Sequence, residues 1–162
     1  MANYVTSDSL GGTQQSVSGT YKTLVNVYAS SSTALRRGKI YDVLVGTNGT
    51  PADNYMEWDI SRFSATAILT ATAVTPNPLD TADSAMLGVS TANATAENTY
   101  VNNGVGASVF YVGVNQRASY RWVAAPGSEL VYAATALVGL GLRTRSGGYT
   151  STATSTLYVT EQ

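Results

Sequence analysis

Residues 55–61 have the sequence Tyr55-Met56-Glu57-Trp58-Asp59-Ile60-Ser61, in which apolar and polar side chains alternate. Successive side chains of a strand point to opposite faces, so Met56, Trp58 and Ile60 share one face and the acidic residues share the other. The same period of two recurs in residues 117–122, 136–143 and 153–159. These four segments predict antiparallel strands with one buried and one exposed face.

Three further segments, residues 22–29, 39–46 and 107–114, carry apolar residues on both faces. In the last of them, Phe110 and Val112 oppose Val109 and Tyr111. A strand that is apolar on both sides is covered on both sides. A second packed layer or a neighbouring subunit would supply that cover.

Turn-forming residues separate these segments. Asn48-Gly49 accepts a positive φ at low cost, and Ala125-Pro126-Gly127-Ser128 has the Pro-Gly order of a type II turn. Ser146-Gly147-Gly148-Tyr149 can link the last two strands. We therefore expect an all-β fold, an antiparallel β-sandwich of jelly-roll or Greek-key type.

The exception to this spacing is the long connection from residue 74 to residue 98, which contains Pro76 and Pro78. Asp80 could cap one helical turn that runs through Met86 and ends at Gly88. We expect at most one short helix in this connection.

The chain has 162 residues, a length typical of one domain. Residues 1–20 are rich in Ser, Thr, Gly, Gln and Asn, with few apolar anchors. We expect them to form a polar N-terminal arm, either loose or ordered against a neighbour, and residues 21–162 to form a single β-sandwich domain.

The composition argues against most enzyme and cofactor chemistry. With no His and no Cys, the chain lacks an imidazole base, a thiolate nucleophile and the commonest zinc ligands. A net charge of −1 gives no electrostatic reason to expect nucleic acid or an anionic membrane as partner. We expect no catalytic residue, no cofactor and no metal site. No signal peptide is visible at the N-terminus, so we expect a soluble protein that is not secreted by that route.

Glu57 and Asp59 are two apart on one strand face and could act together as the carboxylates of a glycoside hydrolase. The alternative is that they simply form the solvated face of an amphipathic strand. Asp80 and Asp83 could share a hard cation, but a helix cap with a first-turn acid explains them more simply.

One long segment resembles a known family. Residues 114–131, Val114-Asn115-Gln116-Arg117-Ala118-Ser119-Tyr120-Arg121-Trp122-Val123-Ala124-Ala125-Pro126-Gly127-Ser128-Glu129-Leu130-Val131, look like a signature of small virion proteins of tailed bacteriophages. Residues 36–46, the turn at 49–54, the strand with Trp58 and Phe63, residues 74–83 and the closing strand at 153–159 resemble the same group. The family resembled is that of head decoration, or cement, proteins, and the similarity covers roughly residues 35–160.

This resemblance implies a jelly-roll-like sandwich, often a homotrimer, that binds the major capsid protein on the outside of the virion after synthesis in the host cytoplasm. We expect Tyr4, Val5, Arg36 and Arg37 to contribute to capsid or subunit contacts. Within the signature, Arg117 and Arg121 share a strand face and could pair with Glu57 or Asp59 of a neighbouring strand. The alternative function is a tail- or vertex-associated module that binds carbohydrate or a receptor, which the eleven tyrosines would suit.

Overall fold

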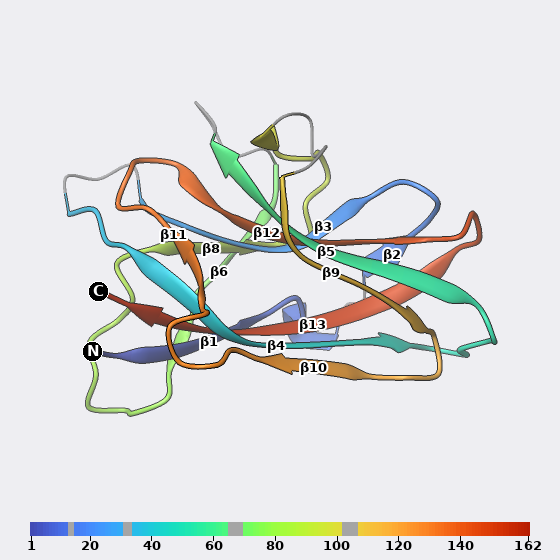
Figure 1. Cartoon of the computed structure of the whole chain (residues 1–162), viewed down its shortest axis with the longest axis horizontal. Coiled ribbons are helices and arrows are strands. Elements are labelled where there is room, and N and C mark those ends of the chain that lie inside the picture. Colours follow the sequence, from blue (N-terminus) through green and yellow to red (C-terminus); the bar gives the residue numbers. More distant parts are fainter. Residues whose placement is uncertain (13–14, 31–33, 65–69, 102–106) are drawn as a thin grey trace.

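The computed structural model describes residues 1–12, 15–30, 34–64, 70–101 and 107–162, which form two antiparallel sheets packed as a sandwich (Figure 1). The strands are β1 (Asn3–Ser7), β2 (Gln15–Val17), β3 (Lys22–Tyr28), β4 (Gly38–Asn48), β5 (Tyr55–Ser64), β6 (Thr72–Val74), β7 (Asn77–Pro78), β8 (Val89–Ala92), β9 (Ser108–Asn115), β10 (Tyr120–Val123), β11 (Leu130–Tyr132), β12 (Val138–Ser146) and β13 (Ser151–Glu161). A short 3-10 turn, η1 (Leu10–Gly12), follows β1.

The strand order is that of a jelly roll. The seven-stranded sheet, called sheet A here, has the order β10-β4-β13-β1-β7, with β11 beside β4 and β2 beside β13. The six-stranded sheet, sheet B, has the order β6-β8-β3-β12-β5-β9. The first and last strands are neighbours in sheet A, and β3 and β12 are neighbours in sheet B, as two nested Greek keys require. This order resolves the choice between the two expected sandwich types.

The core lies between the sheets. It consists of the apolar side chains that the alternation in the sequence predicts to point inward. On β5, Met56, Trp58 and Ile60 are fully buried, and on β12 so are Leu140 and Leu142. They pack against the inward face of sheet A, which contributes the buried residues Ile40, Val43, Val45, Leu157 and Val159. The expected strands are confirmed, although β10 begins only at Tyr120. A turn precedes it, in which Ala118 N donates to Asn115 O. The expected exposed face is wrong for β5 and β12, whose outward side chains, among them Asp59 and Arg143, are buried as well.

The expected turns are confirmed as well. Gly49, Gly127 and Gly148 all have positive φ, and Ser128 N donates to Ala125 O at 2.9 Å. The connection from residue 74 to residue 98 was expected to contain at most one short helix, and the residues described there contain none, so Asp80 does not cap a helical turn. Instead, Asp80 closes a tight turn, because its Oδ1 accepts from Ala82 N and its carbonyl accepts from Asp83 N. The described part of the 74–98 connection contains the short strands β7 and β8 and no helix.

The expected polar arm is corrected by the strand pairing at the N-terminus. β1 pairs with β13 from Asn3↔Thr160 to Ser7↔Thr156, and β2 pairs with the start of β13. Alternate residues of β1 point inward and find polar partners: Thr6 Oγ1 lies 2.7 Å from Ser90 Oγ, and Asp8 accepts from Ser155 N. The composition of residues 1–20 does not predict this burial, because the inward side chains are mostly polar. Residues 13–14 lie outside the described residues.

Candidate functional site

The two carboxylates that suggested glycoside hydrolysis are bound to arginines of the adjacent strand. Asp59 and Glu57 of β5 lie opposite Arg143 and Arg145 of β12 in the strand register. Arg143 Nε lies 2.6 Å from Asp59 Oδ1, and Ser61 Oγ donates to the same oxygen at 2.6 Å. Arg145 forms an ion pair with Glu57. The solvated face expected for these acids is wrong for Asp59, which is only 3% exposed, and both carboxylates are bound to arginine.

Aromatic rings enclose this ladder of charges on the outer face of sheet B. The Arg143 guanidinium lies 4.5 Å from the ring centroid of Tyr21 and 4.4 Å from that of Tyr100. The Tyr100 ring fits because Gly141 is beneath it, where a Cβ would overlap the phenol. Hydrogen bonding from Arg145 lowers the pKa of Glu57, and burial together with Glu57 raises the pKa of Tyr21 to about 12. The two shifts keep Glu57 ionised and Tyr21 neutral at neutral pH.

The signature arginines pair elsewhere than expected. Arg121 Nε donates to Asp42 Oδ1 at 3.0 Å across β10 and β4, and Arg117 lies 3.4 Å from Asp53. Pairing with Glu57 or Asp59 is impossible because β10 belongs to sheet A and β5 to sheet B.

The remaining acids also serve the fold. Apart from Asp83, every acidic side chain binds a cation or a backbone N–H; those not yet mentioned are Glu97 with Thr23 N, Glu129 with Gly127 N and Lys39, and Glu161 with Leu87 N and Gly88 N. Within the described ranges, no three acidic side chains gather as a metal site would require. The arrangement offers structural ion pairs in place of an acid and a base with room for a substrate.

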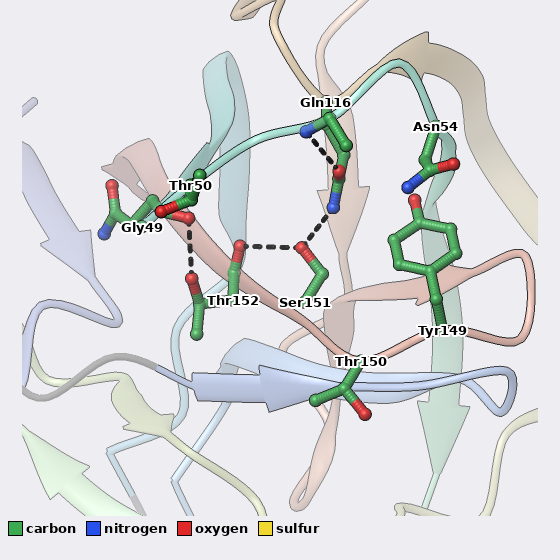
Figure 2. Close-up of a pocket in the computed structure, with 10 residues that line it drawn as sticks. Gly49, Thr50, Asn54, Gln116, Tyr149, Thr150, Ser151 and Thr152 are labelled. Atoms are coloured by element: carbon green, nitrogen blue, oxygen red, sulfur yellow. Dashed lines mark hydrogen bonds between the residues drawn. The ribbon is translucent and has the colours of Figure 1, made fainter.

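A pocket of about 420 Å³ lies where three loops meet at one end of the sandwich (Figure 2). We call it the loop-end pocket. Its wall comes from the β4–β5 loop, the β9–β10 turn and the β12–β13 turn; the lining residues are Asn48, Gly49, Thr50, Ala52, Asn54, Gln116, Tyr149, Thr150, Ser151 and Thr152. No local pattern of residues predicts this pocket, because the three loops are far apart along the chain.

Gln116 joins the three loops. Its Oε1 accepts from Ala52 N at 3.0 Å, its backbone N donates to Asn54 O at 2.9 Å, and its Nε2 donates to Ser151 Oγ at 2.5 Å. Its own carbonyl accepts from Thr47 Oγ1 at 2.6 Å. Gln116 therefore holds the pocket wall in shape.

A second candidate surface is the flank of the sandwich where β9 ends sheet B and β10 lies at the end of sheet A (Figure 1). Apolar side chains there are only partly buried; they are Val109, Phe110, Val112, Val114, Tyr120 and Trp122, and we call this group the β9–β10 flank. Phe110 packs on Trp122 with ring centroids 5.7 Å apart. Beside them, Tyr111 is 55% and Val123 is 58% exposed.

Residues 22–29 and 107–114 are apolar on both faces and were expected to be covered on both sides; they correspond to β3 and β9. The outer side of β3 is covered within the chain, since Thr23 binds Glu97 and Tyr100 and Asn26 binds Asn98. No described strand pairs with the free edge of β9. Within the described residues, the chain itself covers β3 on both sides, whereas β9 keeps exposed positions along its length.

The four residues expected at an interface do not share one role. Tyr4 is 3% exposed and its hydroxyl donates to Ser84 O, so that expectation is corrected: the ring belongs to the interior. Val5 is partly exposed on β1. Arg36 and Arg37 are exposed just before β4, and Arg37 O accepts from Gln162 N. These arginines therefore lie at the end of the sandwich where both chain termini meet (Figure 1).

Comparisons with known proteins add no relative: no family model, no curated protein and no solved structure matches the chain. Among the described residues, no helix has the length and apolar character needed to cross a bilayer.

Proposed function

We propose that this chain is a structural, non-catalytic virion protein that binds the outside of a tailed-phage capsid and stabilises it. The observation that carries the proposal is the β9–β10 flank, which leaves aromatic and aliphatic side chains half-exposed while nearly every carboxylate is engaged within the fold. Free apolar surface combined with bound acids suits a protein that acts by contact. The resemblance of residues 114–131 to decoration proteins supports the same function.

The occupant of the flank, in this proposal, is another copy of the chain. β9 contains no charged residue and no proline, so copies that meet there bring no like charges together. Its free edge can also donate and accept backbone hydrogen bonds. Repetition of one modest patch in a homotrimer would give the avidity that a decoration protein needs on a repeating lattice.

The capsid contact is assigned to the end that carries Arg36 and Arg37, with Val5 nearby on β1. Two exposed cations beside the termini can steer the chain toward an acidic surface of the major capsid protein. Deleting residues 1–20 is a poor test of this contact, because it would remove β1 and β2 from sheet A. Point substitutions of the two arginines test it without damage to the sheet.

The test of the function is the copy number of the chain in purified phage particles, measured by quantitative mass spectrometry against the major capsid protein. A copy number of the same order as that of the capsid protein supports decoration. A handful of copies per particle would indicate a tail or vertex protein instead of a decoration protein. Absence from the particle would overturn the proposal. Particles that lack the chain should also release DNA at lower temperature, and added purified protein should restore the difference.

The second candidate function is a carbohydrate- or receptor-binding module. The loop-end pocket favours it, because its lining side chains are neutral and capable of hydrogen bonding.

A further inference from the structure

We propose that the loop-end pocket binds an uncharged saccharide. This activity deepens the second candidate function and does not depend on the structural role proposed first. The pocket has a volume of about 420 Å³, within the range of roughly 300–1,000 Å³ that is usual for small-molecule sites.

The chemistry of the lining selects the class of ligand. The described lining residues include three side-chain amides and several hydroxyls but no charged group. Phosphates and carboxylates are usually held by Arg or Lys, so an anionic ligand would lack its counter-charge here. A lipid tail would find too few apolar side chains among the lining residues. Sugar hydroxyls both donate and accept hydrogen bonds, and amides and hydroxyls do the same.

Part of the wall is rigid before any ligand arrives. Gln116 Nε2 donates to Ser151 Oγ, and Thr152 Oγ1 donates to Asn48 O at 2.8 Å (Figure 2). Because these groups are already ordered by the fold, a ligand does not have to order them on binding, which favours affinity.

Other groups remain available to a ligand. Within the described residues, no hydrogen bond engages the side chains of Asn48, Thr50 or Asn54. Tyr149 stands beside Asn54, and its hydroxyl donates to Tyr55 O at 2.6 Å, which fixes the ring at the pocket (Figure 2). A fixed ring can pack on the C–H groups of a sugar while the amides bind its hydroxyls.

The position of the pocket fits an exposed binding site. It lies at the end of the sandwich opposite the two termini, on the loops that a rigid sheet scaffold presents to solvent (Figure 1). A saccharide bound there would not compete with contacts made through Arg36 or Arg37 at the opposite end (Figure 1).

The experiment is an NMR titration of the ¹⁵N-labelled full chain with glucose, galactose, mannose, rhamnose and N-acetylglucosamine. Sialic acid and a heparin fragment serve as charged probes. At least one neutral sugar should shift the amide resonances of residues 48–54, 116 and 149–152. Asn54→Ala should weaken the binding affinity for that sugar by about 5–10-fold, the loss expected for one or two hydrogen bonds. The matched control is Asn77→Ala, at an exposed asparagine of β7 outside the pocket.

Three results would overturn the inference: no neutral sugar shifts these resonances, only the charged probes do so, or Asn54→Ala binds as tightly as Asn77→Ala. Thr50→Ala, compared with Thr72→Ala on β6, repeats the comparison with a second pair in case one substitution perturbs the loop. Neither measurement involves a phage particle, so failure here leaves the decoration proposal standing, and the reverse also holds.

Discussion

Arg143 on β12 lies directly opposite Asp59 on β5, and its Nε is 2.6 Å from the Asp59 carboxylate. Both side chains are more than nine-tenths buried, and the rings of Tyr21 and Tyr100 enclose the guanidinium. A charge pair in this setting is costly to break because either partner alone would be a buried, unpaired charge.

Arg143→Ala should therefore lower the free energy of unfolding by about 3–5 kcal/mol, measured by urea denaturation. Arg117→Ala is the matched control, since the side chains of Arg117 and of its partner Asp53 are 62% and 73% exposed. The control should cost about 1 kcal/mol or less. Equal losses for the two variants would contradict the account of a buried pair.

Asp8 should make the protein less stable as the pH rises from about 4 to about 6. Burial raises the pKa of Asp8 to about 6 from an ordinary value of 3.8, even though Ser155 N donates to the carboxylate. The folded state thus holds this proton more tightly than the unfolded state, so stability is greatest below the ordinary pKa and falls as the pH passes through the folded one. Two pKa units correspond to about 3 kcal/mol.

Asp8→Asn keeps an oxygen that accepts from Ser155 N and removes the titration. The variant should gain stability relative to the original chain above pH 6, and the difference between the two should shrink as the pH falls toward 4. Urea midpoints at several pH values check this, and a difference independent of pH would contradict the role of Asp8.

Gln116→Ala should loosen all three loops of the loop-end pocket. The substitution removes the acceptor of Ala52 N and the donor to Ser151, at an expected cost of about 1–3 kcal/mol. Hydrogen–deuterium exchange should accelerate at residues 50–54 and 150–152. Asn115→Ala removes only an exposed acceptor of Arg117 N and should leave both loops protected. Unchanged exchange in Gln116→Ala would show that the loops hold their shape without it.

Tyr111→Lys should prevent self-association through the β9–β10 flank. Tyr111 is 55% exposed, so the fold tolerates the change, and a lysine in the middle of an edge strand opposes pairing with another strand. Sedimentation of the original chain should reveal an oligomer, and Tyr111→Lys should be a monomer with the same circular dichroism. Thr72→Lys, on the opposite edge of sheet B, should still associate. A monomeric original chain, or an oligomeric Tyr111→Lys, would rule out the flank.

Arg37→Glu should weaken binding to undecorated capsids, mainly through slower association, and the difference should diminish at high salt. Stability should change by less than about 0.5 kcal/mol, as for most exposed sites. Arg117→Glu reverses one exposed charge at the β9–β10 turn and serves as the control. Equal binding by the two variants would exclude the termini end as the capsid contact, and Arg36→Glu offers an independent repeat.

The sequence predicted the strands and turns well, because the alternation around Trp58 and Leu140 and the glycines of the turns report local geometry. It failed where long-range pairing decides the outcome. The partner of Asp59 is Arg143, 84 residues away, and strand neighbours had to be known before that pair could be chosen. β1 was missed because Thr6 and Asp8 are buried polar residues, and the burial of a polar side chain depends on partners from distant strands.

The loop-end pocket shows the same limit. Gln116 lies within residues 114–131, but no residue near it in the sequence indicates that its amide binds the loops at Ala52 and Ser151. Only the structure shows that the Gln116 amide is buried in the turn between β9 and β10.

The place of β13 between β4 and β1 in sheet A has a consequence for biosynthesis. Among the described strands, β13 is synthesised after all the others, and it completes the sheet to which β1 belongs, with Asn3 paired to Thr160. Until residues 151–161 emerge, β1 and β4 have no partner between them, so sheet A cannot close during synthesis. Folding that depends on contacts so distant in sequence is slow, on the order of milliseconds to seconds. Nascent chains of this protein therefore expose unpaired strands for the whole of their translation, and chaperone capture during that interval would protect them from aggregation.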